Sequence, residues 1–309
     1  QTSSGYGSDD RWSNTYNLSS KTHELVLHEF GQTVIPGNAK HFSRSTVISQ
    51  PGTRGPATYN DKVQYIQNIS LLAGKEVTLS FFAKADAAKQ IAVSYGQRFG
   101  DGITSDPHWD GPGTKFNLTT EWQRFSKTFT YPALLPAANL GEDHCNYIEF
   151  WFENGSISDF RTDSLGFQSG VFDIAQVQLE EGPHMSAFAS RSINDTYMDC
   201  KRYFEIITVP LNTPLTMLQV LNSSTAYGSF SYFPKRKIPR SITETPIGGL
   251  NAINLSGGDA GGTVSFQSPF SSNMARIDIF GATGLNPGGI SSAFSAGTTT
   301  YLLIDSELF

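Results

Sequence analysis

Residues 146–152 read NYIEFWF, and this stretch decides the fold. Alternate side chains of an extended strand point to opposite faces, so its residues separate into two sets. One set is wholly apolar: Ile148, Phe150 and Phe152. The other set combines rings with a carboxylate: Tyr147, Glu149 and Trp151. This period of two predicts a β-strand with one face on a core and the other facing solvent or a ligand.

The same alternation recurs on both sides of this stretch. Between Trp12 and Leu179 the chain reads as short strand-like segments separated by turn residues: 24–28, 62–66, 77–83, 91–95, 123–129 and 171–179. Segments of this length, with no helical pattern between them, are typical of antiparallel sandwiches. We therefore predict that residues 1–190 form an antiparallel jelly-roll sandwich.

The pattern breaks between Ser192 and Glu205. Asn194 can cap the start of a helix, and apolar residues then recur at spacings of three and four: Tyr197, Cys200 and Phe204. We predict a short linker helix at residues 191–205. Strand-like segments return beyond it, at 217–221, 226–233, 262–267, 274–280 and 298–304. The predicted fold class is therefore all-β: a jelly roll, a short helix, and a second, smaller β-sandwich at 206–309.

Composition supports this fold class and excludes several functions. The 309 residues are 38% hydrophobic, 12% aromatic and only 16% charged, which excludes a helical bundle and a disordered chain. The net charge is -6, so a basic nucleic-acid-binding surface is not expected. No apolar run approaches the roughly 20 residues that span a bilayer, so we expect no membrane insertion. Residue 1 is Gln, so we expect a fragment, a processed product or the ordered part of a longer chain.

A long connection rich in Gly, Pro and Asp, residues 95–116, is the best candidate for a binding site. Sugars present flat apolar faces and hydroxyl edges, which aromatic rings and polar side chains recognise. The residues of this type are Tyr95, Arg98, Asp106, His108, Trp109 and Asp110. The alternative for Trp109 is packing as a loop plug or at a subunit interface. Two Gly- and Ser-rich loops, 251–262 and 281–295, are further candidates, with ordinary sandwich turns as their alternative.

Six sequence segments together resemble segments of a known protein family. They are residues 8–12 (SDDRW), 72–85 (LAGKEVTLSFFAKA), 121–125 (EWQRF), 161–166 (RTDSLG), 170–182 (GVFDIAQVQLEEG) and 200–205 (CKRYFE). With them the chain resembles bacteriophage tail fibre and host-recognition structural proteins, whose common domain is similar to carbohydrate-binding jelly rolls. The match beyond residue 205 is weaker, in 230–239 and 302–308.

The resemblance implies a phage virion surface protein of tail fibre or spike type. Its implied role is non-catalytic adhesion to a host surface polysaccharide or receptor, with other virion proteins attached through the N-terminal side. By similarity to fibres, a homo-oligomer is expected, and a trimer is preferred. A purely structural role, in capsid decoration or tail assembly, stays open as an alternative.

The resemblance also implies a structural calcium site, while no other cofactor is expected. Asp173 alternates with apolar residues in 171–179, and a lone inward carboxylate needs a partner. In carbohydrate-binding jelly rolls an acidic residue of the last strand often helps to hold calcium with the N-terminal segment. Asp173 with Asp9 or Asp10 is therefore a candidate oxygen cage. The alternative is that Asp173 accepts backbone hydrogen bonds or pairs with Arg11.

A glycan-cleaving depolymerase is the remaining rival function. Glycoside hydrolases need two carboxylates at a fixed separation. The sequence offers several pairs, but their spacing selects none: Glu149 and Glu153, Asp159 and Asp163, Glu180 and Glu181. The sequence also shows no nucleophile elbow, no metalloprotease motif, no P-loop and no β-helix repeat. We therefore expect a protein without enzyme activity.

Overall fold

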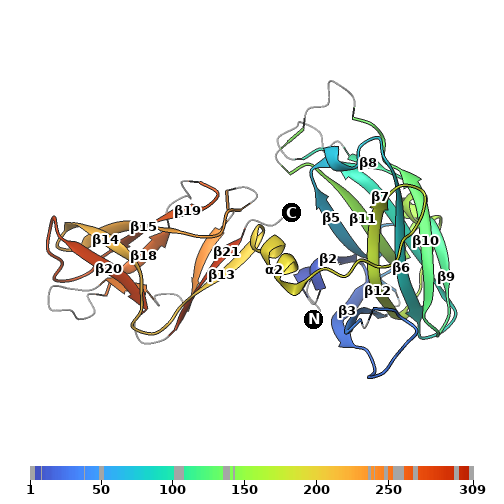
Figure 1. Ribbon diagram of the computed structural model, residues 1–309, viewed down its shortest axis with the longest axis horizontal. Coiled ribbons are helices and arrows are strands. Elements are labelled where there is room, and N and C mark those ends of the chain that lie inside the picture. Colours follow the sequence, from blue (N-terminus) through green and yellow to red (C-terminus); the bar gives the residue numbers. More distant parts are fainter. Residues whose placement is uncertain are drawn as a thin grey trace. The chain divides into compact units, whose positions relative to one another are not determined.

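The computed structural model describes residues 4–7, 9–37, 39–48, 52–100, 108–134, 140–141, 143–235, 238–239, 241–246, 250–252, 261–266, 271–295 and 299–305. The chain divides into two compact units, Gln1–Ser190 and Arg191–Phe309. Antiparallel strands make up most of each unit (Figure 1). The predicted all-β fold class is confirmed.

One layer of the first unit is a seven-stranded sheet with the order β1-β2-β5-β11-β7-β8, and β9 also pairs with β7. Its strands are β1 (Gly5–Gly7), β2 (Asp9–Asn17), β5 (Tyr59–Gln67), β7 (Lys89–Arg98), β8 (His108–Asp110), β9 (Thr114–Leu118) and β11 (Cys145–Asn154). The stretch that decides the fold therefore lies in β11, at the centre of this sheet.

The second layer is a five-stranded sheet with the order β10-β6-β12-β4-β3. Its strands are β3 (Ser20–Leu27), β4 (His41–Ile48), β6 (Glu76–Ala85), β10 (Gln123–Thr130) and β12 (Gly170–Glu181). From β4 to β7 and again from β9 to β12, consecutive strands belong to opposite sheets. This repeated crossing between two packed antiparallel sheets is the connectivity of a jelly-roll sandwich.

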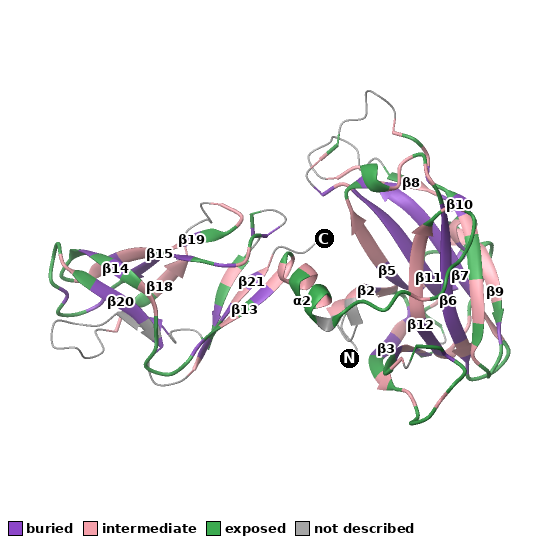
Figure 2. Ribbon diagram, viewed as in Figure 1, coloured by how far each residue is buried: buried purple, intermediate pink, exposed green. Residues whose placement is uncertain are grey.

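The main core lies between the two sheets, where the inner residues of β6 and β11 meet. Leu79 and Phe81 of β6 and Phe150 and Phe152 of β11 are fully buried, and the rings of Phe81 and Phe150 pack edge to face. Figure 2 shows the buried residues concentrated on these central strands. The alternation of residues 146–152 is confirmed, because Ile148, Phe150 and Phe152 all join the core.

Among the described residues of the first unit, three short helical turns lie between the strands: η1 (Ile69–Leu71), η2 (Ser156–Ser158) and α1 (Asp159–Thr162). The sequence analysis did not predict them, because an element of three or four residues is too short to show a helical period. The segment from η2 to α1 follows β11 directly. Its helix α1 packs against β7, β9 and β11 of the seven-stranded sheet.

The second unit begins with α2 (Ile193–Lys201), which Ser192 caps by accepting a hydrogen bond from the backbone N–H of Asp195. Its strands form a three-stranded sheet, β13-β21-β16, and a six-stranded sheet, β17-β20-β14-β15-β19-β18. They are β13 (Phe204–Val209), β14 (Pro214–Asn222), β15 (Thr225–Ser231), β16 (Ser241–Thr245), β17 (Leu250–Ala252), β18 (Thr263–Phe266), β19 (Met274–Phe280), β20 (Ile290–Ser295) and β21 (Thr300–Asp305).

A helix therefore lies within the predicted range 191–205, but it ends at Lys201, and Phe204 and Glu205 belong to β13. Its cap is Ser192 and not Asn194. A separate apolar core serves the second unit, built from buried residues of both sheets such as Leu218, Ile277 and Leu302. Among the helices that the structure describes, none is long and apolar enough to cross a membrane.

Candidate functional site

The outer face of the seven-stranded sheet carries a cluster of aromatic rings and charged side chains. Strand register builds it, because paired residues point to the same side of a sheet. Tyr147 pairs with Tyr65, and Trp151 pairs with Asp61. Glu149 lies between them on the same face. We call this set the polar face: Tyr59, Asp61 and Tyr65 of β5, Ser94 and Arg98 of β7, His108 and Asp110 of β8, Tyr147, Glu149 and Trp151 of β11, and Arg161 of α1.

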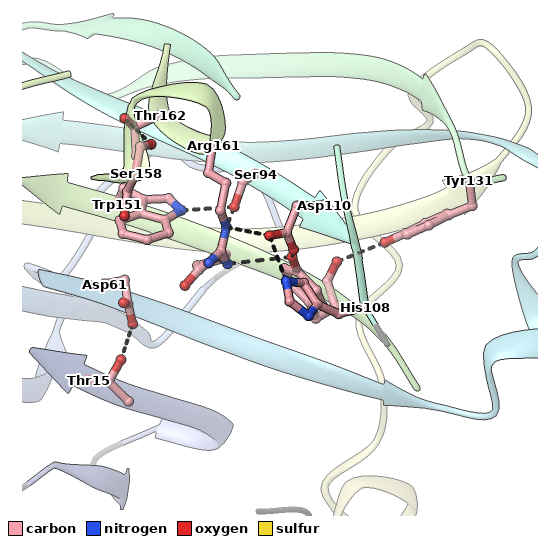
Figure 3. Close-up of polar contacts among 12 residues, drawn as sticks. Thr15, Asp61, Ser94, His108, Asp110, Tyr131, Trp151, Ser158, Arg161 and Thr162 are labelled. Carbon is pink, nitrogen blue, oxygen red and sulfur yellow. Dashed lines mark hydrogen bonds and ion pairs between the residues drawn. The ribbon is translucent and has the colours of Figure 1, made fainter. Parts of the chain in front are cut away.

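Arg161 is the central cation of the polar face (Figure 3). Its guanidinium donates to Glu149 Oε2 at 2.5 Å and lies 3.5 Å from Asp110 Oδ2. It also covers the ring of Trp151, with 4.9 Å between the guanidinium carbon and the ring centroid. As a result Trp151 is only 2% exposed, although it lies on the outer face of the sheet.

A close backbone contact holds Arg161 in this position. The N–H of Gly113 donates to the carbonyl of Phe160 at 2.9 Å. A Cβ atom at Gly113 would lie 2.2 Å from the carbonyl oxygen of Arg161, so only glycine allows this approach. Within the turn, the hydroxyl of Thr162 donates to the carbonyl of Ser158 at 2.9 Å. The guanidinium is therefore presented by a fixed turn rather than by a free loop.

Two buried carboxyl groups, Glu149 and Asp61, lie on the polar face with Arg161, and burial favours their protonated forms. Burial raises the pKa of Glu149 to about 8, and the neighbouring charge of Asp61 adds to the shift while Arg161 opposes it. Burial likewise raises the pKa of Asp61, against the opposing charge of Lys21. The two carboxyls are 6% and 2% exposed. At neutral pH the coupled pair therefore keeps one proton, and Arg161 balances the remaining charge.

Hydrogen bonds fix the rings around this pair. The indole N–H of Trp151 donates to Ser94 Oγ at 2.8 Å, and that hydroxyl donates to Glu149 Oε2 at 3.0 Å. The hydroxyl of Tyr147 donates to Asp110 Oδ1. Burial raises the pKa of Tyr147, so this hydroxyl stays protonated and acts as a donor.

The remaining part of the polar face is more open to solvent. Arg98 lies over Tyr65, with 5.3 Å from the guanidinium carbon to the ring centroid. Burial raises the pKa of Tyr65 to about 12, although Arg98 opposes the shift. Tyr59 and Tyr65 are half-buried, and His108 is exposed. Aromatic rings and hydrogen-bond donors are therefore partly exposed on this part of the polar face.

The structure separates the ligand residues that the sequence analysis grouped together. Arg98, His108 and Asp110 lie on the polar face. Tyr95 lies on the opposite side of β7, stacked on Phe129 with 3.7 Å between ring centroids, and is 9% exposed. Trp109 packs on Tyr95 at the edge of the core, with 5.6 Å between the centroids. Both rings therefore face inward. For Trp109 this agrees with the alternative that the ring packs as a loop plug and does not contact ligand. Asp106 lies outside the described residues.

Eight residues of the polar face were missing from the candidate ligand set: Tyr59, Asp61, Tyr65, Ser94, Tyr147, Glu149, Trp151 and Arg161. The alternation of residues 146–152 did contain a signal for three of them, because it placed Tyr147, Glu149 and Trp151 on the face opposite the core. Nothing in the sequence marked Arg161, since its position depends on the contact between α1 and Gly113.

Asp173 has an ion-pair partner on the outer face of the other sheet. Arg44 donates to both of its carboxylate oxygens, at 2.8 and 2.9 Å, and Lys84 Nζ lies 3.9 Å away. This is the ion-pair alternative, with Arg44 in the place of Arg11. The side chains of the other candidate ligands, Asp9 and Asp10, are not among those described. Within the described part of the chain, no cluster of three or more His, Cys, Asp or Glu side chains suits a metal ion.

The expected inward position of Asp173 is wrong, and a bulge explains why. Phe172 and Ile174 point into the core, so Asp173 points outward. At Gln176 the backbone adopts a positive φ of 48°, and the register with β6 shifts between Ala175 and Gln178. The extra residue reverses the alternation, so Val177 packs against the core although it follows Asp173 by an even number of residues.

A family model matches part of the first unit. Residues 34–140 match the carbohydrate binding domain family. This range contains β5, β7 and β8 of the polar face, while β11 and α1 lie beyond it. Among curated proteins, none matches the chain.

Several solved structures are similar to the chain at low identity. A CBM22 xylan-binding domain from Paenibacillus barcinonensis is 15% identical, covers 56% of this chain and 92% of its own, and has a TM-score of 0.36. A family 11 carbohydrate-binding module from Clostridium thermocellum, in complex with a β-1,3-1,4-mixed-linked tetrasaccharide, is 13% identical, with 60% and 97% covered and a TM-score of 0.35. The N-terminal cellulose-binding domain of a Cellulomonas fimi β-1,4-glucanase is 20% identical, with 47% and 80% covered and a TM-score of 0.29.

Proposed function

We propose that the first unit binds a saccharide on the polar face of its seven-stranded sheet. The observation that carries this proposal is the juxtaposition of half-buried rings with fixed hydrogen-bonding groups on one sheet face. Tyr59 and Tyr65 supply ring faces, and Arg98, Arg161 and Asp110 supply donors and acceptors. A sugar ring needs both, because its C–H groups stack on aromatic rings while its hydroxyls form hydrogen bonds. The match of residues 34–140 to the carbohydrate binding domain family supports the same function.

The buried groups of the polar face position the groups that touch the ligand. Glu149 and Asp110 hold Arg161 from two sides, and Asp110 also accepts from Tyr147. A guanidinium held in this way loses little conformational freedom when it donates to a sugar hydroxyl. The polar face is therefore organised before the ligand arrives.

The geometry opposes a glycan-cleaving activity at this site. Retaining glycosidases hold two carboxyls about 5 Å apart, and inverting enzymes hold them farther apart to admit water. Asp61 and Glu149 are instead both almost fully buried, at 2% and 6% exposure. Carboxyls covered in this way are not accessible to a glycosidic bond.

The biological setting that we propose is adhesion to a host surface polysaccharide by a phage virion protein that acts as an oligomer. The resemblance of residues 161–166 and 170–182 to tail fibre and host-recognition proteins supports this setting. Weak single sites on an oligomer combine into strong attachment when several engage one surface. The rival of a purely structural virion role predicts that no saccharide binds.

Calorimetric titration of the full chain tests the proposal. The probes are neutral oligosaccharides of about four sugar units, including xylan, cellulose and mixed-linkage glucan fragments, chosen from the similarities above. Binding by the native chain should weaken about tenfold in Tyr65→Ala, because stacking is lost. Lys127→Ala, an exposed change on the other sheet, is the matched control and should bind as the native chain does.

Two outcomes of the same titration would contradict the proposal. If no oligosaccharide of the panel, and no host polysaccharide extract, binds to the native chain, the polar face does not recognise saccharides. If Tyr65→Ala binds as the native chain does, the site lies elsewhere. The thermal unfolding of each variant shows whether the fold is intact.

A further inference from the structure

The outer face of the six-stranded sheet in the second unit contains a groove of about 370 Å³. Its lining comes from β14, β15 and β19: Met217, Gln219, Tyr227, Gly228, Ser229 and Arg276. In the register, Gln219 pairs with Tyr227, and Ser229 pairs with Arg276. The groove therefore runs across three adjacent strands. Its volume lies within the roughly 300–1,000 Å³ that is typical of small-ligand sites.

Charge inside the groove is balanced. Arg276 Nε donates to Asp278 Oδ1 at 2.6 Å, and Asp278 is 4% exposed. The carboxylate thus neutralises the guanidinium from beneath, while the Arg276 side chain stays 40% exposed. The whole second unit is also neutral, with 8 basic and 8 acidic residues from Arg191 onward. A strongly anionic or cationic ligand would find no uncompensated charge in this groove.

The groove combines apolar surface with fixed polar groups. The guanidinium of Arg276 lies over the ring of Tyr227, 5.0 Å from its centroid. The Tyr227 hydroxyl donates to Gln219 Oε1 at 2.6 Å, which orients both side chains. Met217 adds an apolar side chain that is 63% exposed. The groove therefore offers amide, guanidinium and hydroxyl groups beside a thioether and a ring.

We infer that this groove is a second saccharide site, specific for a neutral sugar. A ligand that fits it needs an apolar face for Met217 and Tyr227, hydroxyls for Gln219 and Arg276, and no net charge. Neutral sugars have all three properties. The inference uses observations of the second unit alone and does not rest on the function proposed for the first. A chain with one site in each unit can hold a polysaccharide at two points.

Methionine methyl NMR tests the inference on the full chain. The protein has four methionines, and Met217 lines the groove while Met185 lies in the first unit. Labelled methyl groups are followed while the neutral oligosaccharides of the panel above are added. We expect a saturable shift of the Met217 signal with an unchanged Met185 signal. Arg276→Gln should weaken this response about tenfold, as expected for the loss of a bidentate donor.

Arg202→Gln is the matched control, because it removes the same charge from an exposed position of the same unit. Its Met217 response should equal that of the native chain. A Met217 signal that no oligosaccharide moves would overturn the inference, even if the polar face binds sugar. A Met217 signal that moves with protein concentration alone would also overturn it, because the groove would then be an interface between copies. If Met217 responds while Tyr65→Ala changes nothing, the function proposed for the first unit fails and this inference stands.

Discussion

The outer faces of the two sheets in the first unit both carry ion pairs between arginine and carboxylate side chains, but the ratio of cations to carboxyls is opposite on the two faces. On the seven-stranded sheet, one guanidinium serves several carboxyls: Arg161 meets Glu149 and Asp110, with Asp61 close by. On the five-stranded sheet, one carboxylate serves two cations, because Asp173 lies between Arg44 and Lys84.

We interpret the Asp173 ion pair as a structural link between strands, which we call the brace, and the polar face as a candidate binding site. Asp173 is satisfied by a bidentate guanidinium, and its pair links β12 to β4. On the polar face, Glu149 instead stays largely protonated at neutral pH, because burial and the charge of Asp61 raise its pKa to about 8. Strongly shifted pKa values cluster at functional sites, where burial and neighbouring like charges produce them. The comparison therefore predicts that the two faces respond differently to substitution and to pH.

Removing the carboxylate of the brace should give the largest loss of stability. Asp173→Ala leaves Arg44 and Lys84 side by side on a half-buried surface without their counter-ion. We expect a loss of about 2–3 kcal/mol, below the usual cost for fully buried pairs because Arg44 is 32% exposed. Urea unfolding measures it, and Asp86→Ala, at an acid that is 43% exposed, is the control with a loss below about 0.5 kcal/mol. An equal effect of the two changes would show that Asp173 is no brace.

Removing the Arg161 cation from the polar face should lower the free energy of unfolding less than Asp173→Ala does. It should weaken saccharide binding, which Asp173→Ala should not. Arg161→Met leaves Glu149 and Asp110 without their shared partner, and we expect a loss of about 2 kcal/mol at pH 8. The loss should be smaller at pH 5, because the acid pair then takes up protons. Saccharide binding in the titration above should fall at least about tenfold. Unchanged binding in a folded variant would remove Arg161 from the site.

The acid pair should make stability depend on pH. The pKa of Glu149 is raised from 4.5 to about 8 on folding, so the folded chain holds a proton that the unfolded chain releases. Stability is therefore greatest below about pH 4.5 for this group, and falls as the pH rises toward 8. We expect the free energy of unfolding, measured by urea denaturation, to decrease between pH 5 and pH 8.

Glu149→Gln sharpens this comparison, because an amide resembles the protonated acid. Its unfolding free energy should vary less between pH 5 and pH 8 than that of the native chain. A native stability that rises over this range would contradict the raised pKa of Glu149.

Tyr147→Phe should give the smallest effect. It removes the hydroxyl that donates to Asp110 and leaves the ring beneath Arg98 and Arg161. One hydrogen bond to a charged acceptor is lost, so thermal unfolding should show a loss of about 1 kcal/mol. Tyr301→Phe, at a ring that is 43% exposed, is the control and should change little. No difference between the two variants would place Asp110 outside the network.

The strand alternation in the sequence predicted the layers of the fold, and it also separated the two faces of β11. The alternation assigned side chains to the wrong face where a strand continued farther than expected or contained a bulge. Tyr95 was assigned to a ligand loop, but β7 continues to Arg98 and keeps that ring inward. At Asp173 the bulge at Gln176 reversed the faces, and the sequence contains no glycine at this position to mark it.

The polar face was predictable only in part, because a tertiary contact completes it. Arg98, His108 and Asp110 stood out as polar residues near a long loop. Arg161 enters from a four-residue helix, whose place depends on the glycine at 113 lying against its backbone. A single sequence shows neither that contact nor the burial that raises the pKa of Glu149.

The central claim is that the outer face of the seven-stranded sheet holds a saccharide. A crystal structure of the chain with the tightest-binding oligosaccharide of the panel tests it most directly. The account predicts sugar density over Tyr59 and Tyr65, with hydroxyls within hydrogen-bond distance of Arg98 or Arg161. Sugar bound only elsewhere, with the polar face open to solvent, would contradict it.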